Sequence, residues 1–297
     1  MGLGVLSVTQ AIEPVETLEL WPDVPPGGGG PTGPIHVTPK GGVSHISRPY
    51  IQVYQPKKPN GSAVLVAGGG GLKHINMKQE ALPAAVWLAS HGITAFVLAY
   101  RLPREGWTAG ARVALQDSQR AVRLIRARAR AYHLDARRIG VLGFSAGGYL
   151  MGLEADWFDF SSYAPVDSID FLSARPDNAA LIYPVITLEP PYQHTSTRKQ
   201  MLGEHPSAQA SAEWSVQTHV RPSSPPVFLV QAKDDPISNP ANTLIMKKAC
   251  LQAGVPVSFH QLASGGHGFG MGVQGTPTAQ WPILYESWLV QRGMIKI

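Results

Sequence analysis

Cysteine is almost absent from this chain of 297 residues, since Cys250 is the only one. No disulfide can therefore form within the chain. Cys250 lies in TLIMKKACLQAG, a helical pattern in which a lone cysteine typically fills the core. A chain without disulfides fits the cytoplasm and does not exclude export. The N-terminal MGLGVLSVTQAI lacks a basic start and a full apolar segment, so a signal-peptide remnant and an ordinary tail both remain open.

Long uncharged apolar runs and metal-ligand spacings are also missing. No stretch predicts a membrane span. The sequence contains no H-E-x-x-H, and the histidines other than His260 and His267 show no metal-ligand spacing. We therefore expect no metal and no cofactor.

Acidic residues are outnumbered, with a net charge of +5 and a pI near 9.3. Much of the excess lies in residues 111–138, where arginines alternate with apolar residues at three- and four-residue spacing. This pattern predicts an amphipathic helix with its arginines on a solvated outer face, and with Asp117 paired to Arg120. No aromatic-rich RNA motif or metal-finger spacing accompanies it, so we expect no nucleic-acid partner.

The chain divides at a proline- and glycine-rich stretch, residues 22–34. Such a stretch cannot form a helix or a central strand, so residues 1–34 are predicted to be an arm on the surface. Residues 35–297 are predicted to form one α/β domain. Short apolar strands alternate there with helix-length segments, which indicates a mostly parallel sheet with helices on both faces. Two long irregular segments, at about 156–178 and 186–222, are expected to shape a binding site.

The stretch GFSAGG places Ser145 between small residues, directly after the strand RIGVLGF and before a helix. A G-x-S-x-G turn from strand to helix holds a nucleophilic serine out of the backbone, and the glycines allow the strained turn. A structural role for a small residue at this junction is the alternative.

A base and an acid follow Ser145 in the order typical of the α/β-hydrolase fold. His267 lies in ASGGHGFG, on a glycine-rich loop after the strand VPVSFHQL, whereas His260 lies inside that strand. The acid is Asp234 or Asp235, which both follow the strand VFLVQA. A carboxylate there fixes the tautomer of the base and stabilises its protonated form.

Four glycines end an early strand in VLVAGGGGLKH. They match neither a P-loop nor a dinucleotide-binding fingerprint. At a strand end, such a loop directs backbone N–H groups toward an oxyanion, together with the N–H of Ala146.

These residues resemble the bacterial α/β-hydrolase esterases of the acetylxylan esterase or xylanase-B-like group. The resemblance runs from about residue 17 to the C-terminus and includes GGGGLKHINMKQEALPAAVWLASHGITAFVLAYRLP, RIGVLGFSAGGYL, QAKDDPISNPANT and GGHGFG. It implies an α/β-hydrolase fold, Ser145 as nucleophile and His267 as base. The D-x-x-V-P pattern of the group implies Asp235 as the acid, although Ser238 and Asn239 replace its last two residues.

The same resemblance assigns the oxyanion donors. The P-G-G-G-Y loop of the group corresponds to GGGGL at 68–72, which implies the N–H groups of Gly70 and Gly71, with Gly69 as a further candidate. Leu72 replaces the aromatic residue, which is expected to alter the acyl or leaving-group pocket.

The expected activity is hydrolysis of short acyl esters, typically acetyl esters of plant cell-wall carbohydrate, so the partner is a small-molecule or carbohydrate ester. The sequence carries no signal for an oligomeric state. An amide hydrolase of the arylformamidase type and a serine peptidase remain alternatives, although no propeller-like sequence accompanies the triad. Short acyl groups are expected because the two irregular segments supply bulky residues to cover the strand ends: Trp157, Phe158, Phe160, Tyr163, Tyr192 and Trp214.

Overall fold

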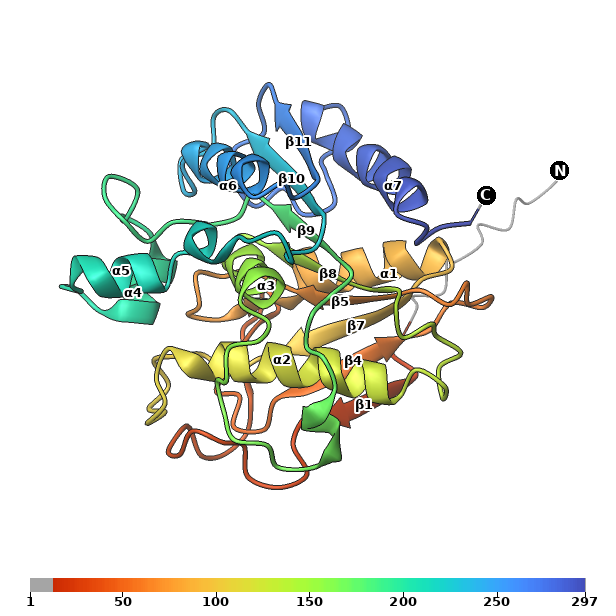
Figure 1. Cartoon of the computed structure of the whole chain (residues 1–297), viewed down its shortest axis with the longest axis vertical. Helices are drawn as coiled ribbons and strands as arrows, with labels where there is room; N and C mark the ends of the chain where they lie inside the picture. Colours follow the sequence, from red (N-terminus) through yellow and green to blue (C-terminus); the bar gives the residue numbers. More distant parts are fainter. Residues whose placement is uncertain (1–12, 297) are drawn as a thin grey trace, which may run out of the picture.

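An eight-stranded sheet runs through the centre of the protein, as a computed structural model describing residues 13–296 shows (Figure 1). Neighbouring strands are parallel from β7 through β11, while β4 is antiparallel to both β1 and β7. Their order across the sheet is β1 (Glu16–Glu19), β4 (Tyr50–Tyr54), β7 (Thr94–Ala99), β5 (Ala63–Ala67), β8 (Ile139–Phe144), β9 (Asn178–Ile182), β10 (Val227–Ala232) and β11 (Val257–Leu262). The predicted α/β-hydrolase fold with a mostly parallel sheet is confirmed.

Helices cover both faces of this sheet (Figure 1). On one face, α1 (Leu82–Ser90) and α7 (Trp281–Gln291) lie side by side, with Trp87 stacked on Tyr285. The other face is covered by α2 (Arg112–Ala127), α3 (Ala146–Asp156) and α6 (Ala241–Gln252). Short turns of other helix types, η1 (Met77–Ala81) and η4 (Pro277–Gln280), precede α1 and α7.

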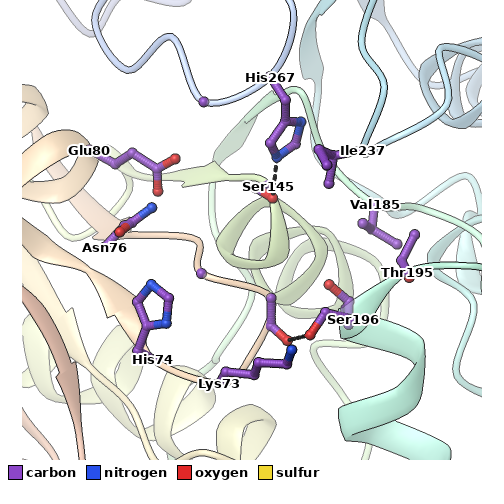
Figure 2. Close-up of a pocket in the computed structure, with 14 residues that line it drawn as sticks. Lys73, His74, Asn76, Glu80, Ser145, Val185, Thr195, Ser196, Ile237 and His267 are labelled. Atoms are coloured by element: carbon purple, nitrogen blue, oxygen red, sulfur yellow. Dashed lines mark hydrogen bonds between the residues drawn. The ribbon is translucent and has the colours of Figure 1, made fainter.

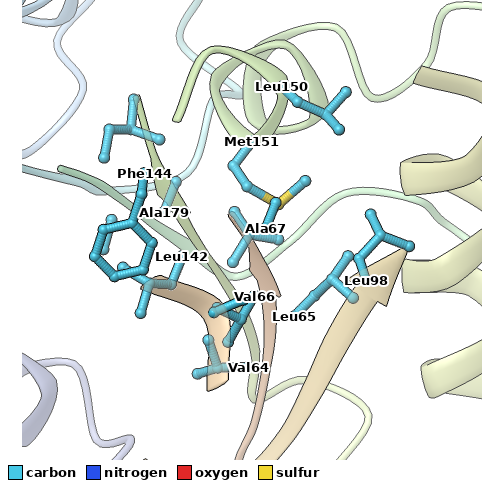
Figure 3. Close-up of a cluster of buried hydrophobic side chains, with 14 of the residues drawn as sticks. Val64, Leu65, Val66, Ala67, Leu98, Leu142, Phe144, Leu150, Met151 and Ala179 are labelled. Atoms are coloured by element: carbon cyan, nitrogen blue, oxygen red, sulfur yellow. The ribbon is translucent and has the colours of Figure 1, made fainter. Parts of the chain in front are cut away.

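The core forms because the central strands are apolar on both faces. Every residue of β5, β7 and β8 is buried. Leu150 and Met151 of α3 pack over the side chains of β5, as Figure 3 shows. Each large apolar side chain that is fully buried contributes roughly 1.5–3 kcal/mol. This rigid sheet fixes the positions of the loops that follow its strands.

Three short strands were not predicted from the sequence. A second, antiparallel sheet joins β2 (His36–Val37), β3 (Gly42–Ser44) and β6 (Ile75–Asn76). β6 follows the glycine loop, which we define as residues 68–72. Strands of two or three residues are too short to show a period, so only tertiary pairing defines them.

The predicted arm requires a correction within its described part. Residues 1–12, which include the proposed signal-peptide remnant or tail, lie outside the described residues. β1 extends the central sheet, and Leu20 and Trp21 are buried in the core. The Trp21 indole N–H donates to the Asp117 carboxylate at 2.9 Å. Residues 16–21 therefore belong to the folded domain. A short edge strand and two buried apolar residues leave no long apolar run in the sequence, so the pattern did not indicate this.

The prediction for α2 is also wrong in part. Asp117 forms a buried ion pair with Arg101, not with Arg120. Arg120 is itself buried and pairs with Asp167 and Asp170, which lie in the segment 156–178. This segment lies across α2. It covers part of the helix face that the spacing of apolar residues predicts to be solvated, and so makes that part interior.

The two irregular segments differ in content. Residues 156–178 contain one short helical turn, η2 (Ser168–Phe171). Residues 186–222 contain α4 (Ser196–Leu202), α5 (Ala208–Glu213) and η3 (Val216–His219), which the sequence analysis missed. Thr195 and Ser207 cap α4 and α5, and these N-cap residues were the available signal. Within residues 13–296, no helix is long and apolar enough to cross a membrane.

Candidate active site

Ser145 lies on a strained turn between β8 and α3. Its backbone has φ 52° and ψ −116°, in a region that residues other than glycine seldom adopt. The chain packs closely around the turn: a Cβ at Gly143 would lie 2.2 Å from the Gly147 carbonyl oxygen, and one at Gly147 would lie 2.3 Å from that of Ala67. The small residues are therefore required by the turn, which presents the Ser145 hydroxyl at the carboxyl end of the sheet.

His267 lies on the histidine loop, residues 263–270, and reaches this hydroxyl. The His267 Nε2 atom is 2.8 Å from the Ser145 Oγ atom (Figure 2). Its Nδ1 atom is 2.7 Å from Oδ2 of Asp235. The side chain of Asp235 is fully buried, and that of His267 is 15% exposed. Three side chains from three different strand ends thus form one hydrogen-bonded chain.

The two neighbouring aspartates have different partners. Oδ1 of Asp235 accepts hydrogen bonds from the N–H groups of Ile237 and Ser238, and Oδ2 accepts from the side chain of Gln231. These donors leave its carboxylate aimed at His267. Asp234 instead accepts from the N–H groups of Gly265 and Gly266, at 2.9 Å each. The structure brings Asp235 to the imidazole and directs Asp234 to the backbone of the histidine loop.

The glycine loop lies beside Ser145. Gly70 and Gly71 have φ of 111° and 64°, which favour glycine, and both line the same cavity as Ser145. Among the described residues, no acceptor takes the N–H of Gly70 or of Ala146, so both remain available to a ligand. Gly69 differs, because its N–H donates to a carboxylate oxygen of Glu80 at 2.6 Å. Gly69 is therefore not a free donor.

Two further residues of the site were not identified from sequence. Glu80 of η1 is buried and lines the cavity, and its Oε1 accepts from the Tyr183 hydroxyl at 3.0 Å. Burial raises the pKa of Glu80, against the lowering effect of hydrogen bonds from Gly69 and Tyr183. A single glutamate at the start of an apolar helix was the only sequence signal, and such residues commonly face solvent.

The active-site cavity has a volume of about 330 Å³. Figure 2 shows Ser145 and His267 opposite His74, Asn76 and Glu80. The remaining lining residues are Gly70, Gly71, Lys73, Val185, Thr195, Ser196, Thr197, Ile237 and Gly268. Leu72, in contrast, is buried and is not part of this lining.

The expected aromatic cover over the strand ends is wrong. None of the six aromatic residues of the irregular segments lines the cavity. Trp157 stacks on Phe160 and packs edge-on against Trp214, while Tyr163 packs against Trp21. Aromatic residues of this size gain more by packing on the core than by covering a polar site. The residues that border the cavity from segment 186–222 are Thr195, Ser196 and Thr197 instead.

The remaining histidines and acids do not assemble another centre. His260 lies in β11 and bonds to the Ser258 hydroxyl at 2.9 Å, away from Ser145. In residues 13–296 no three histidine, cysteine, aspartate or glutamate side chains are grouped so as to hold a metal.

Comparison with known proteins finds similarity to enzymes named for xylan and acetyl esters. The BD-FAE family model matches residues 51–250. An acetylxylan esterase of Xylanibacter ruminicola is 29% identical over 234 residues, which cover 77% of this chain and 45% of that protein. Endo-1,4-beta-xylanase B of Butyrivibrio fibrisolvens is 31% identical over 205 residues, 69% of this chain and 32% of that protein. The chain therefore spans less than half the length of each of these curated relatives.

A solved structure matches over nearly the whole length. The acetyl ester-xyloside bifunctional hydrolase of Caldicellulosiruptor lactoaceticus superposes with a TM-score of 0.80 at 31% identity, covering 97% of this chain and 100% of that one. The predicted resemblance to the acetylxylan esterase and xylanase-B-like group is confirmed. The expected enzyme class, carboxylic ester hydrolase, agrees with the names of the acetylxylan esterase and of the acetyl ester-xyloside bifunctional hydrolase.

Proposed function

This chain belongs to the BD-FAE family, and from that premise and the site geometry we propose that it is a serine carboxylesterase acting on short acyl esters. The observation that carries the proposal is the chain of contacts from Ser145 Oγ to His267 Nε2, and from His267 Nδ1 to Asp235 Oδ2. A serine hydroxyl is a weak nucleophile until a base accepts its proton. His267 is within hydrogen-bond reach of that proton, and Asp235 fixes the tautomer that accepts it.

In the acylation half, His267 takes the Ser145 proton while Oγ attacks the ester carbonyl carbon. The carbonyl oxygen becomes an oxyanion, for which the N–H groups of Gly70, Gly71 and Ala146 are the proposed donors. Ala146 begins α3, so the N-terminal end of a helix adds a favourable dipole. His267 then gives its proton to the departing alkoxide, and the acyl group stays on Ser145.

The deacylation half repeats these steps with water. His267 removes a proton from the attacking water, the same donors stabilise the second oxyanion, and the carboxylic acid leaves as Oγ regains its proton. No cofactor takes part in this scheme. The buried Asp235 stabilises the imidazolium that forms in both halves.

Acetyl and similar short groups are the proposed acyl groups. A cavity of about 330 Å³ is at the small end of the range for ligand sites. Val185 and Ile237 supply its apolar side chains. Thr195, Ser196 and Thr197 also line the cavity, so it offers little further apolar surface to a longer acyl chain.

Carbohydrate is the proposed alcohol part, as in the xylan-related relatives. A second cavity of about 520 Å³ adjoins the first and shares His74 and Asn76 with it. Thr38, Lys40 and Gln79 also line it. These side chains offer donors and acceptors to sugar hydroxyl groups.

Ser145→Ala tests the nucleophile. Without the hydroxyl no acyl-enzyme forms, so kcat for p-nitrophenyl acetate should fall by roughly three to six orders of magnitude, with the unfolding curve unchanged. A folded Ser145→Ala protein that keeps most of its ester hydrolysis would exclude the mechanism.

A substrate panel tests the reaction class and the acyl size. Acetyl and propionyl p-nitrophenyl esters should give higher kcat/KM than octanoyl esters, and acetylated xylan should release acetate. N-formyl aromatic amines form the other arm of the panel. Faster turnover of these amides than of any ester would favour the formamidase type of function.

A further inference from the structure

Two loops that are far apart in the sequence meet at one buried carboxylate. The glycine loop is bonded to Glu80, and the histidine loop is bonded to Tyr183, which is itself bonded to Glu80. We propose that Glu80 is a positioning residue for ester hydrolysis, which holds the glycine loop through Gly69 and the histidine loop through Tyr183. This inference rests on the proposed function and adds a residue to it.

The contact with the glycine loop is short and central. Glu80 Oε2 accepts the Gly69 N–H at 2.6 Å. A Cβ placed on Gly69 would lie 3.0 Å from that oxygen and 2.8 Å from the Ser145 Cβ. Gly69 is thus held between Glu80 and the nucleophile, and it immediately precedes the proposed donors Gly70 and Gly71. A shift of Glu80 would shift those N–H groups relative to Ser145.

The contact with the histidine loop passes through Tyr183. The Tyr183 hydroxyl donates to Glu80 Oε1 and accepts the Gly270 N–H, each at 3.0 Å. The ring also packs edge-on against His267, with centroids 4.9 Å apart. Tyr183 has φ 40°, so the chain holds it in an unfavourable conformation directly after β9. Its hydroxyl and its ring both fix the loop that carries the base.

Packing alone does not explain a carboxylate at this place. No arginine or lysine of the described chain forms an ion pair with Glu80. A buried, unpaired carboxylate costs free energy that an apolar side chain would not. Two convergent donors offset part of that cost, and the charge attracts a protonated His267. These contacts all favour the arrangement needed in the transition state.

The test uses Glu80→Gln and Tyr183→Phe. A glutamine has nearly the shape of glutamate, but its one carbonyl oxygen replaces two acceptors, so its NH₂ group faces one of the two donors. Each variant should lower kcat for p-nitrophenyl acetate roughly 10- to 100-fold and leave KM within about threefold, because oxyanion donors act in the transition state.

Two matched controls separate positioning from general destabilisation. Glu154→Gln alters another fully buried carboxylate, which accepts from the Ser118 hydroxyl at 2.6 Å. Tyr149→Phe removes another buried hydroxyl, which donates to the Trp214 carbonyl at 2.7 Å. Both controls should keep kcat within about twofold of the wild type, whatever they do to the urea midpoint.

The outcomes distinguish this inference from the proposed function. An active wild type with Glu80→Gln and Tyr183→Phe no slower than their controls would overturn the positioning role and leave the esterase intact. A higher KM with unchanged kcat would overturn it as well. If Glu80→Gln does not fold, Tyr183→Phe decides alone. A wild type that hydrolyses no ester would instead overturn the proposed function itself.

Discussion

Carboxylates are buried both at the active-site edge and around α2, but the groups that compensate their charge differ. Beside α2, Asp117 pairs with Arg101, and Asp170 pairs with Arg120. We call these four residues the ion-pair cluster. At the active-site edge, Asp235 and Glu80 accept hydrogen bonds from backbone N–H, amide and hydroxyl donors, and His267 is the only basic side chain paired with either in residues 13–296.

The difference has a physical consequence. In the ion-pair cluster each negative charge is neutralised by a guanidinium that never loses its proton, so the cluster stabilises one arrangement of the chain. At the active-site edge the charge is held in place without being neutralised. It can then stabilise an imidazolium that exists only during the reaction. The buried carboxylates of these two regions therefore divide into a structural and a functional group according to the partner that faces them.

The largest effect is expected at Asp235. Asp235→Asn keeps the shape of the side chain but presents an amide to His267, so the imidazole is held in the wrong tautomer. We expect kcat to fall by about 10⁴, with little change in the urea midpoint. Steady-state kinetics on p-nitrophenyl acetate measure the effect.

Asp234→Asn is the matched control for this prediction. The asparagine carbonyl oxygen can still accept the two N–H groups of Gly265 and Gly266, so kcat should fall only a few-fold. A larger loss for Asp234→Asn than for Asp235→Asn would exchange the roles of the two aspartates.

A smaller effect, on stability and not on rate, is expected in the ion-pair cluster. Asp117→Asn leaves the Arg101 guanidinium buried without its counter-charge, which should lower the free energy of unfolding by about 3–5 kcal/mol. Urea denaturation measures this, and kcat of the folded variant should stay within about threefold of the wild type.

Glu19→Gln provides the exposed counterpart, because Glu19 and Arg48 pair on the surface. There the expected cost is about 0–1 kcal/mol. If Asp117→Asn reduced kcat as strongly as Asp235→Asn, the division into structural and functional carboxylates would fail.

The last prediction concerns a buried carboxylate that belongs to neither region. Within residues 13–296, Glu154 has no ion-pair partner and no histidine bonded to it, and burial raises its pKa to about 8 from 4.5. Between these values the folded state binds more protons than the unfolded state, so stability falls as the pH rises, by at most about 1.4 kcal/mol per pH unit. Glu154→Gln removes this contribution. The urea midpoint of Glu154→Gln should therefore rise relative to that of the wild type from pH 5 to pH 8. A constant difference between the two midpoints across that range would contradict the raised pKa of Glu154.

The sequence by itself predicts the central sheet and the order of the candidate catalytic residues along the chain. Apolar runs such as those of β5, β7 and β8 fix buried parallel strands, because such strands have no polar face. Strands of this kind are followed, in the order typical of the fold, by the G-x-S-x-G turn, the two aspartates and the histidine on its glycine-rich loop. Their local signals are strong because each depends on neighbouring residues.

Only the tertiary structure decides between residues whose local signals are alike. Asp234 and Asp235 share a strand end, and the donors from Ile237, Ser238 and Gln231 determine which one faces His267. Arg120 carries the pattern of a solvated helix face until the segment 156–178 covers it. Glu80 joins the site through contacts with residues 11 and 103 positions away. Periodicity reports which side of an element is apolar, but the partner on that side is chosen by long-range packing.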